Sequence, residues 1–238
     1  MPYLWVAANL YHLPFVDGAF TGTVMVRVYH HLENPAAAMR ELARVLRAGG
    51  RAIVSYSPKP SWGTMVIDVQ HALRSSKEAP FRSTTFSRAP AVEVSSGNEF
   101  PTVVSSRERF AATAHAAGFR VESEEGTGFE EFRPLRRFPS DYFRRWSQSV
   151  GRAPGFPVRF ARLVVERPRP SPWTARERIL ACPRCRTGLD APVEGRGLLC
   201  PACSYAGSWS DGVIDLRFVP EGARRVVVRS ADIAPPRA

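Results

Sequence analysis

All four cysteines of the chain lie in its last quarter and form two matching pairs. The pairs are Cys182-Pro-Arg-Cys185 and Cys200-Pro-Ala-Cys203, with fourteen residues between them. This spacing is typical of a zinc site built from two knuckles, each of which supplies two thiolates. Four thiolates complete the tetrahedral coordination of Zn²⁺ and leave no position open for a substrate. The pattern therefore predicts a structural zinc ion held by Cys182, Cys185, Cys200 and Cys203.

Two disulfides and a redox-active cysteine pair are the alternatives to zinc. The N-terminus lacks a basic segment followed by an apolar one and a cleavage site, so an exported, disulfide-forming protein is disfavoured. A redox-active pair would not need a second copy. No apolar run approaches the length that crosses a membrane. We therefore expect a cytoplasmic protein without a membrane span.

The N-terminal quarter has the pattern of a strand, a helix and a second strand. The apolar run 23–28 predicts a buried strand. Asn34-Pro35 predicts a helix start, and Gly49-Gly50 predicts the end of that helix. Residues 52–54 predict the next buried strand. Together these elements predict a right-handed βαβ crossover.

Three consecutive segments of this quarter resemble a known family. They are LPFVDGAF (residues 13–20), VYHHLENP (28–35) and RELARVLRAGGR (40–51). In this order and spacing they resemble the class I S-adenosylmethionine (SAM) dependent methyltransferases, in the branch that acts on small molecules, lipids, quinones and some RNAs. The resemblance implies an α/β fold with a Rossmann-like sheet over residues 1–166. It also implies the family's last two strands near Phe119–Val121 and Phe156–Glu166, the latter antiparallel. Ahead of these strands, the residues themselves predict a helix that Ser105 or Ser106 caps and that runs to Ala117.

The resemblance also implies where SAM would bind. Asn9 and Leu10 occupy the position of the family's Asp-Ala pair that contacts adenine, and the amide oxygen of Asn9 can still accept a hydrogen bond. Arg27 lies at the end of the first predicted strand and is a candidate for lining the SAM site. The family's Gly-rich SAM loop and its ribose-binding acidic residue precede the part that this chain matches. We therefore expect the sheet's first strands to be missing, and activity to be impaired, in the chain as written.

The C-terminal part is expected to form a second domain. Residues 167–178 are a Pro/Arg-rich linker, residues 179–219 the zinc ribbon and residues 220–238 a flexible tail. ILACPRCRTGL and DGVIDLR, which surround the cysteine frame, resemble the small zinc protein that activates tRNA, rRNA and release-factor methyltransferases.

The chain carries 33 basic and 22 acidic residues, a net charge of +11. This charge fits either a surface selected to bind a polyanion or the arginine bias of a GC-rich genome, because all but two basic residues are arginines. Residues 132–152 interleave arginines with aromatic residues, as in phosphate contact with base stacking, or as in an amphipathic helix with solvated arginines.

Two functions from different classes follow. The first is a SAM-dependent methyltransferase that acts on a small molecule or an RNA, with a zinc ribbon that stabilises it or helps it hold substrate. The second is a non-enzymatic module that binds RNA or protein through the ribbon and an arginine-rich face on a degenerate methyltransferase scaffold. Both readings leave the methyl acceptor, if any, and the oligomeric state open.

Overall fold

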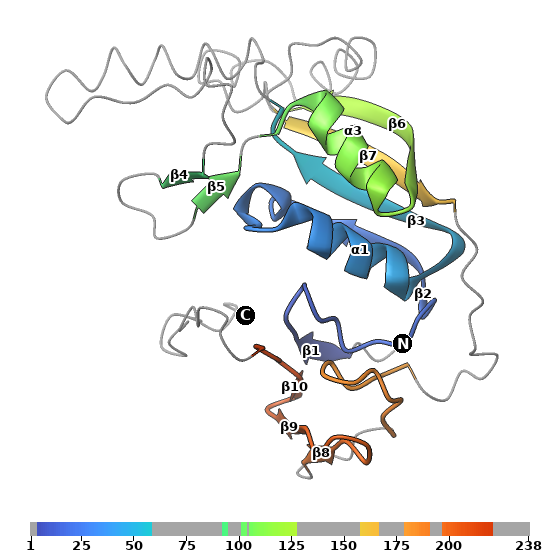
Figure 1. Ribbon diagram of the computed structural model, residues 1–238, viewed down its shortest axis with the longest axis vertical. Coiled ribbons are helices and arrows are strands. Elements are labelled where there is room, and N and C mark those ends of the chain that lie inside the picture. Colours follow the sequence, from blue (N-terminus) through green and yellow to red (C-terminus); the bar gives the residue numbers. More distant parts are fainter. Residues whose placement is uncertain are drawn as a thin grey trace, which may run out of the picture. The chain divides into compact units, whose positions relative to one another are not determined.

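The computed structural model describes residues 4–58, 92–94, 101–103, 105–127, 158–166, 179–190 and 197–220. The chain divides into two compact units (Figure 1). We call Met1–Phe15 with Glu177–Ala238 the cysteine-rich unit, and Val16–Arg176 the sheet unit. Among the described residues, no helix combines the length and the apolar character needed to cross a membrane.

The sheet unit is built on four strands in the order β2-β3-β7-β6 (Figure 1). Strand β2 (Phe20–Met25) is parallel to β3 (Leu46–Tyr56). Strand β7 (Val158–Val165) is antiparallel to both β3 and β6 (Phe119–Thr127). The predicted βαβ crossover and the antiparallel last strand are both confirmed, and with them the α/β fold class.

Helix α1 (Pro35–Val45) begins as its sequence predicts. The Asn34 side-chain oxygen accepts a hydrogen bond from the Ala37 amide at 3.0 Å, and Pro35 occupies the first turn, where its missing N–H costs nothing. The predicted end at Gly49-Gly50 is wrong, because the helix stops at Val45. Leu46 instead begins β3 opposite Phe20 and is 2% exposed, so sheet pairing and burial prevail over another helical turn.

Helix α3 (Arg107–Ala116) also has a side-chain cap, since Ser106 Oγ accepts a hydrogen bond from the Arg109 amide at 3.2 Å. Gly118 follows the helix with φ of +94°, a conformation that glycine adopts without strain. Figure 1 shows α1 and α3 on the same side of the sheet. The core on this side consists of fully buried side chains from both helices and from the strands, among them Met39, Val54, Tyr56, Phe110, Phe119 and Leu163.

Three further elements of the sheet unit lie in the part of the chain that the structure describes. The residues Tyr29–His31 form a short 3-10 turn, η1, shortly after β2. Strands β4 (Val92–Val94) and β5 (Pro101–Val103) pair antiparallel with each other. The arginine- and aromatic-rich stretch 132–152 lies outside the described residues.

The described residues of the cysteine-rich unit form four short strands in the order β1-β10-β9-β8. Strands β8 (Leu198–Leu199), β9 (Ala206–Ser210) and β10 (Val213–Asp215) form an antiparallel meander. Asp211 and Gly212 make the turn between β9 and β10, with φ of 52° and 76°. Two consecutive positive φ values are the requirement of a type I′ hairpin turn, for which Asp-Gly is a preferred sequence.

Strand β1 (Trp5–Ala7) corrects one prediction. Residues 1–15 were expected to belong to the methyltransferase sheet of residues 1–166, but β1 pairs in parallel with β10, Val6 opposite Ile214. The physical reason is that β10 offers an unpaired edge beside an apolar core, against which Val6 and Phe15 pack. The strand therefore belongs to the cysteine-rich unit.

Candidate functional site

The two cysteine pairs lie in loops with the same backbone geometry. In the first loop, the Cys182 amide donates to the Thr187 carbonyl, and Cys182's own carbonyl accepts from the Arg186 amide, both at 2.8 Å. In the second loop, the Cys200 amide donates to the Tyr205 carbonyl at 2.8 Å, and Cys200's carbonyl accepts from the Ser204 amide at 3.1 Å. The residue after the second cysteine has a positive φ in each loop, 66° at Arg186 and 56° at Ser204. The loops are thus two copies of one knuckle.

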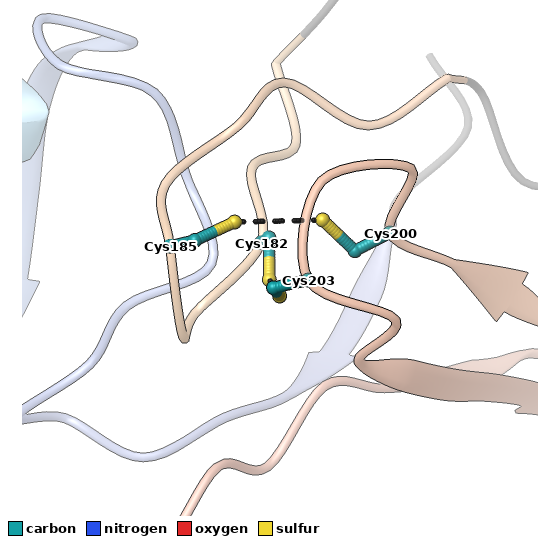
Figure 2. A group of neighbouring side chains, drawn as sticks. All are labelled: Cys182, Cys185, Cys200 and Cys203. Atoms are coloured by element: carbon teal, nitrogen blue, oxygen red, sulfur yellow. Dashed lines mark hydrogen bonds between the residues drawn. The ribbon is translucent and has the colours of Figure 1, made fainter.

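The knuckles bring the four thiols together (Figure 2). Cys182 Sγ lies 3.6 Å from Cys203 Sγ, and Cys185 Sγ lies 3.5 Å from Cys200 Sγ, while all four sulfurs lie within 4.8 Å of one another. These distances exceed the S–S bond of a disulfide, about 2.05 Å. Four sulfurs that bind zinc at about 2.3 Å are about 3.8 Å apart in a regular tetrahedron. The residues present therefore fit Zn²⁺, with a ligand set that is complete without substrate.

The surroundings of the thiols differ. Burial raises the pKa of Cys182 to about 12, whereas hydrogen bonding to the Thr187 side chain lowers the pKa of Cys185 to about 6. Without a metal, Cys182 therefore keeps its proton at neutral pH, and binding of a metal has to displace that proton. A metal ion that binds thiolates strongly can displace this proton.

The same unit holds the segment 4–15 at both ends. The Leu216 amide donates to the Ala7 carbonyl at 2.9 Å, and the Ala181 amide donates to the Pro14 carbonyl at 3.0 Å. Ala181 directly precedes the first metal-binding candidate, Cys182. The order of the segment is therefore coupled to the order of the knuckles through adjacent backbone groups.

The first two predicted SAM-site residues lie in this segment. Asn9 Nδ2 donates to the Phe218 carbonyl at 2.8 Å, and Asn9 Oδ1 accepts from the Tyr11 amide at 3.0 Å. Leu10 occupies the turn that the His12 amide closes on the Asn9 carbonyl at 2.9 Å. Both polar atoms of the Asn9 side chain thus have partners within the cysteine-rich unit, and contact with adenine stays a prediction.

Arg27, the third predicted residue, lies in the sheet unit, two residues after β2. Its φ of 59° is in the left-handed region, which costs a residue with a side chain about 1–2 kcal/mol. The Arg27 amide donates to Ser55 Oγ at 2.7 Å. Because β2 and β3 are parallel, Arg27 and Ser55 lie at the carboxyl edge of this pair, the edge at which α/β folds bind ligands.

The turn η1 extends the same edge. The rings of His30 and His31 lie 4.0 Å apart between centroids. Burial, and then the neighbouring His31 and Arg27, lower the pKa of His30 below its ordinary value. His30 is therefore neutral at pH 7, and the fixed positive charge at this point is that of Arg27.

A buried ionic cluster in the sheet unit was not predicted. Tyr56 donates to one carboxylate oxygen of Glu124 at 2.9 Å, while Arg107 and the fully buried Arg159 pair with the other oxygen. The four residues come from β3, β6, β7 and α3, and no sequence spacing connects them. A sequence signal that could have found Glu124 is the cluster of Glu residues directly after the strand predicted near Phe119–Val121.

A second ionic cluster joins two of the recognised segments. Arg44 Nη1 donates to Asp17 Oδ1 at 2.7 Å, and Arg44 Nη2 donates to Glu41 Oε2 at 2.9 Å. The Gly18 amide also donates to the Arg44 carbonyl at 2.9 Å. LPFVDGAF is thereby fixed to the helix of RELARVLRAGGR by the charged residues of both segments.

Comparison with known proteins gives one family match and several distant relatives. Residues 2–54 match the family model described as "Methyltransferase domain". A 60-residue stretch, 25% of this chain, is 37% identical to an uncharacterized 37.1 kDa protein in a transposon of Streptomyces fradiae, and spans 16% of that protein.

Three solved structures illustrate the structural similarity. The first, from Haloferax volcanii, is a complex of the Trm112 methyltransferase activator with a methyltransferase; identity is 14% and the TM-score 0.42, over 68% of this chain and 60% of that one. A SAM-dependent methyltransferase from Methanosarcina mazei has 15% identity and a TM-score of 0.40, over 68% and 66%. One from Thermotoga maritima has 17% identity and a TM-score of 0.39, over 66% and 62%.

The chain thus spans 16% of the curated relative and 60% of the first of these solved chains, less than two thirds of either. The matched residues 2–54 contain β1, β2, η1, α1 and most of β3. They include all three predicted SAM-site residues and the segments joined by Arg44. Residues 2–54 are similar to the methyltransferase domain family, whose model they match.

Proposed function

We propose that the protein transfers a methyl group from SAM to an acceptor whose identity is open, a small molecule or an RNA. The observation that carries this proposal is the family match over residues 2–54, which coincides with the parallel β2-α1-β3 crossover. In the proposed reaction a lone pair of the acceptor attacks the methyl carbon as the bond from that carbon to the sulfonium sulfur breaks. The products are S-adenosylhomocysteine and the methylated acceptor, which loses its proton where it carries one.

The sulfonium methyl is already activated, so the protein's task is to orient the two reactants and to exclude water. Asn9 and Leu10 are the proposed contacts to adenine, and Arg27 is a proposed contact at the carboxyl edge of β2. His30 and His31 are assigned no catalytic role, because orientation and desolvation require no particular base.

The proposed role of the cysteine-rich unit is structural. Zinc held by Cys182, Cys185, Cys200 and Cys203 would fix the two knuckles and, through Ala181, the segment 4–15. This role agrees with the sequence resemblance to the small zinc protein that activates other methyltransferases. In this chain the ribbon and the methyltransferase motif are parts of one polypeptide, and Asn9 and Leu10 lie in the segment that the ribbon holds.

Calorimetric titration of the full 238-residue chain with SAM tests the proposal. Binding of SAM, followed by slow transfer of label from methyl-labelled SAM to an RNA or small-molecule fraction, is the expected result, because the sequence predicts impaired activity. ATP serves as a control, because it shares adenine but lacks the methionine part. Absence of SAM binding by zinc-loaded chain would contradict the proposal and favour a non-enzymatic binding module.

A further inference from the structure

At the carboxyl edge of the β2–β3 pair, the backbone of Arg27 has an unfavourable conformation that a hydrogen bond to β3 stabilises. Arg27 has a φ of 59°, although asparagine, aspartate or glycine is the usual choice in this region. Such a conformation persists only where neighbouring groups over-determine it, and it is common where a ligand has to be met at a fixed position.

Ser55 stabilises this conformation of the Arg27 backbone. Its hydroxyl accepts the Arg27 amide hydrogen at 2.7 Å, and the Ser55 residue is 2% exposed. Ser55 belongs to the long central strand β3, which pairs with β2 on one side and β7 on the other. The acceptor of this hydrogen bond is therefore fixed by the sheet, and it fixes the Arg27 backbone in turn.

The positive charge of Arg27 at this edge favours a carboxylate as the group that it binds. Arg27 is exposed and permanently charged, and its own charge helps to keep the neighbouring His30 neutral. An arginine of this kind binds a carboxylate through two parallel hydrogen bonds. SAM carries one carboxylate, in its methionine part, close to the reacting sulfonium.

We propose that Arg27 binds the carboxylate of SAM and that Ser55 is the positioning residue that keeps Arg27 in place for it. This inference rests on the proposed function, since it names the part of SAM that one residue recognises. The proposal explains why the residue at this strained position is an arginine. The fold alone does not require one, because glycine would adopt the same φ without strain.

Calorimetric titration of the full chain with SAM and with decarboxylated SAM tests the inference. Arg27→Gly keeps the backbone conformation and removes the guanidinium. It is expected to weaken SAM binding about tenfold while leaving the affinity for decarboxylated SAM unchanged. Ser55→Ala is expected to weaken SAM binding less, and Ser55→Thr, which keeps a hydroxyl, is expected to restore it.

The double variant Ser55→Ala/Arg27→Gly separates positioning from a structural effect. If Ser55 acts through Arg27, the double variant binds SAM no more weakly than Arg27→Gly alone. The matched control is Asp211→Gly, which likewise places glycine at a positive φ, 52°, in the turn between β9 and β10 and is expected to leave SAM affinity unchanged. Circular dichroism confirms that each variant is folded.

Three results would overturn the inference alone: unchanged SAM affinity in Arg27→Gly, equal losses for SAM and decarboxylated SAM, or additive losses in the double variant. If the unaltered zinc-loaded chain binds neither ligand, the proposed function fails and this inference fails with it. The unaltered chain therefore distinguishes the two failures.

Discussion

The cysteine-rich unit and the sheet unit differ in what stabilises their folded structures. Among the residues that the structure describes, the buried core of the cysteine-rich unit has seven, two of which are the cysteines Cys182 and Cys200. Its longest strand, β9, has five residues. In the sheet unit, β3 alone has eleven residues and is paired on both sides, and two helices cover one face. A core as small as that of the cysteine-rich unit rarely supports a fold without a metal or disulfides. The sheet unit, by contrast, is stabilised by the burial of its apolar side chains.

This difference matters for the methyltransferase motif, which belongs to both units. Residues 4–15 of the family match lie on the small unit, and residues 16–54 lie in the large one. The predicted adenine contacts therefore depend on the metal-binding unit, while Arg27 and Ser55 depend on the sheet. The comparison predicts that metal loss and core damage affect different parts of the motif.

The largest expected effect is that of removing a metal ligand. The unaltered chain should bind one zinc per chain. Cys182→Ser should lose that zinc and the order of its unit, because zinc binding by such sites supplies about 10–16 kcal/mol. Metal analysis after gel filtration measures the stoichiometry. Ser204→Gly, in the second knuckle at a φ of 56°, is the control and should keep the metal. A chain purified with zinc present that holds none would contradict the metal assignment.

A large effect confined to the other unit should follow from Phe110→Ala. The Phe110 ring is fully buried and stacks on Tyr56 with 3.9 Å between ring centroids. Truncation should lower the free energy of unfolding of the sheet unit by about 3–5 kcal/mol and leave zinc content unchanged. Urea unfolding followed by helical circular dichroism measures the loss. A simultaneous loss of zinc would break the distinction between the units.

A smaller effect is expected from Tyr56→Phe, with a dependence on pH. The Tyr56 hydroxyl donates to Glu124, so its loss should cost about 1–3 kcal/mol at neutral pH. Burial, and then the charge of Glu124, raise the pKa of Tyr56 above its ordinary 10.0. The unfolded tyrosine ionises near that value and the native one does not, so stability is complete below it and falls as pH rises above it.

Tyr56→Phe should therefore flatten the fall in stability above pH 10. The flattening should be partial, because burial raises the pKa of Tyr29 as well. Urea unfolding between pH 8 and 11 measures both slopes. An equally steep fall in the variant would show that Tyr56 does not titrate as a buried group.

The smallest expected effect is the loss of a helix cap. Ser106→Ala removes the hydroxyl that accepts the Arg109 amide, and should lower the stability of the sheet unit by about 1 kcal/mol. Ser106→Asp, which keeps an acceptor, is the control and should restore it. Thermal unfolding measures the change, and a loss as large as that of Phe110→Ala would mean that Ser106 does more than cap α3.

Local signals predicted the local structure well. The spacing of Cys182 to Cys203 places four thiols on two matched loops, and Asn34 and Ser106 cap the helices that follow them. Each depends on residues close in sequence. The end of α1 was placed too late because its true end depends on Leu46 pairing with Phe20, which helical spacing does not reveal.

Contacts between distant residues were the ones missed. The pairing of β1 with β10 joins residues more than 200 positions apart, and an apolar strand such as Trp5–Ala7 fits either of two sheets equally well in sequence. The Glu124 cluster and the bond from Arg27 to Ser55 likewise join separate strands. A strained φ at an arginine has no sequence signal, because the usual glycine or asparagine is absent.

The most direct test of this account is hydrogen exchange along the full chain with and without a zinc chelator. We predict that chelation abolishes protection in residues 4–15 together with residues 197–218, and leaves protection in β2, α1 and β3 unchanged. That result would show that the metal-binding unit holds the first part of the methyltransferase motif. Protection of residues 4–15 that survives chelation, or that is lost together with β2 and β3, would contradict it.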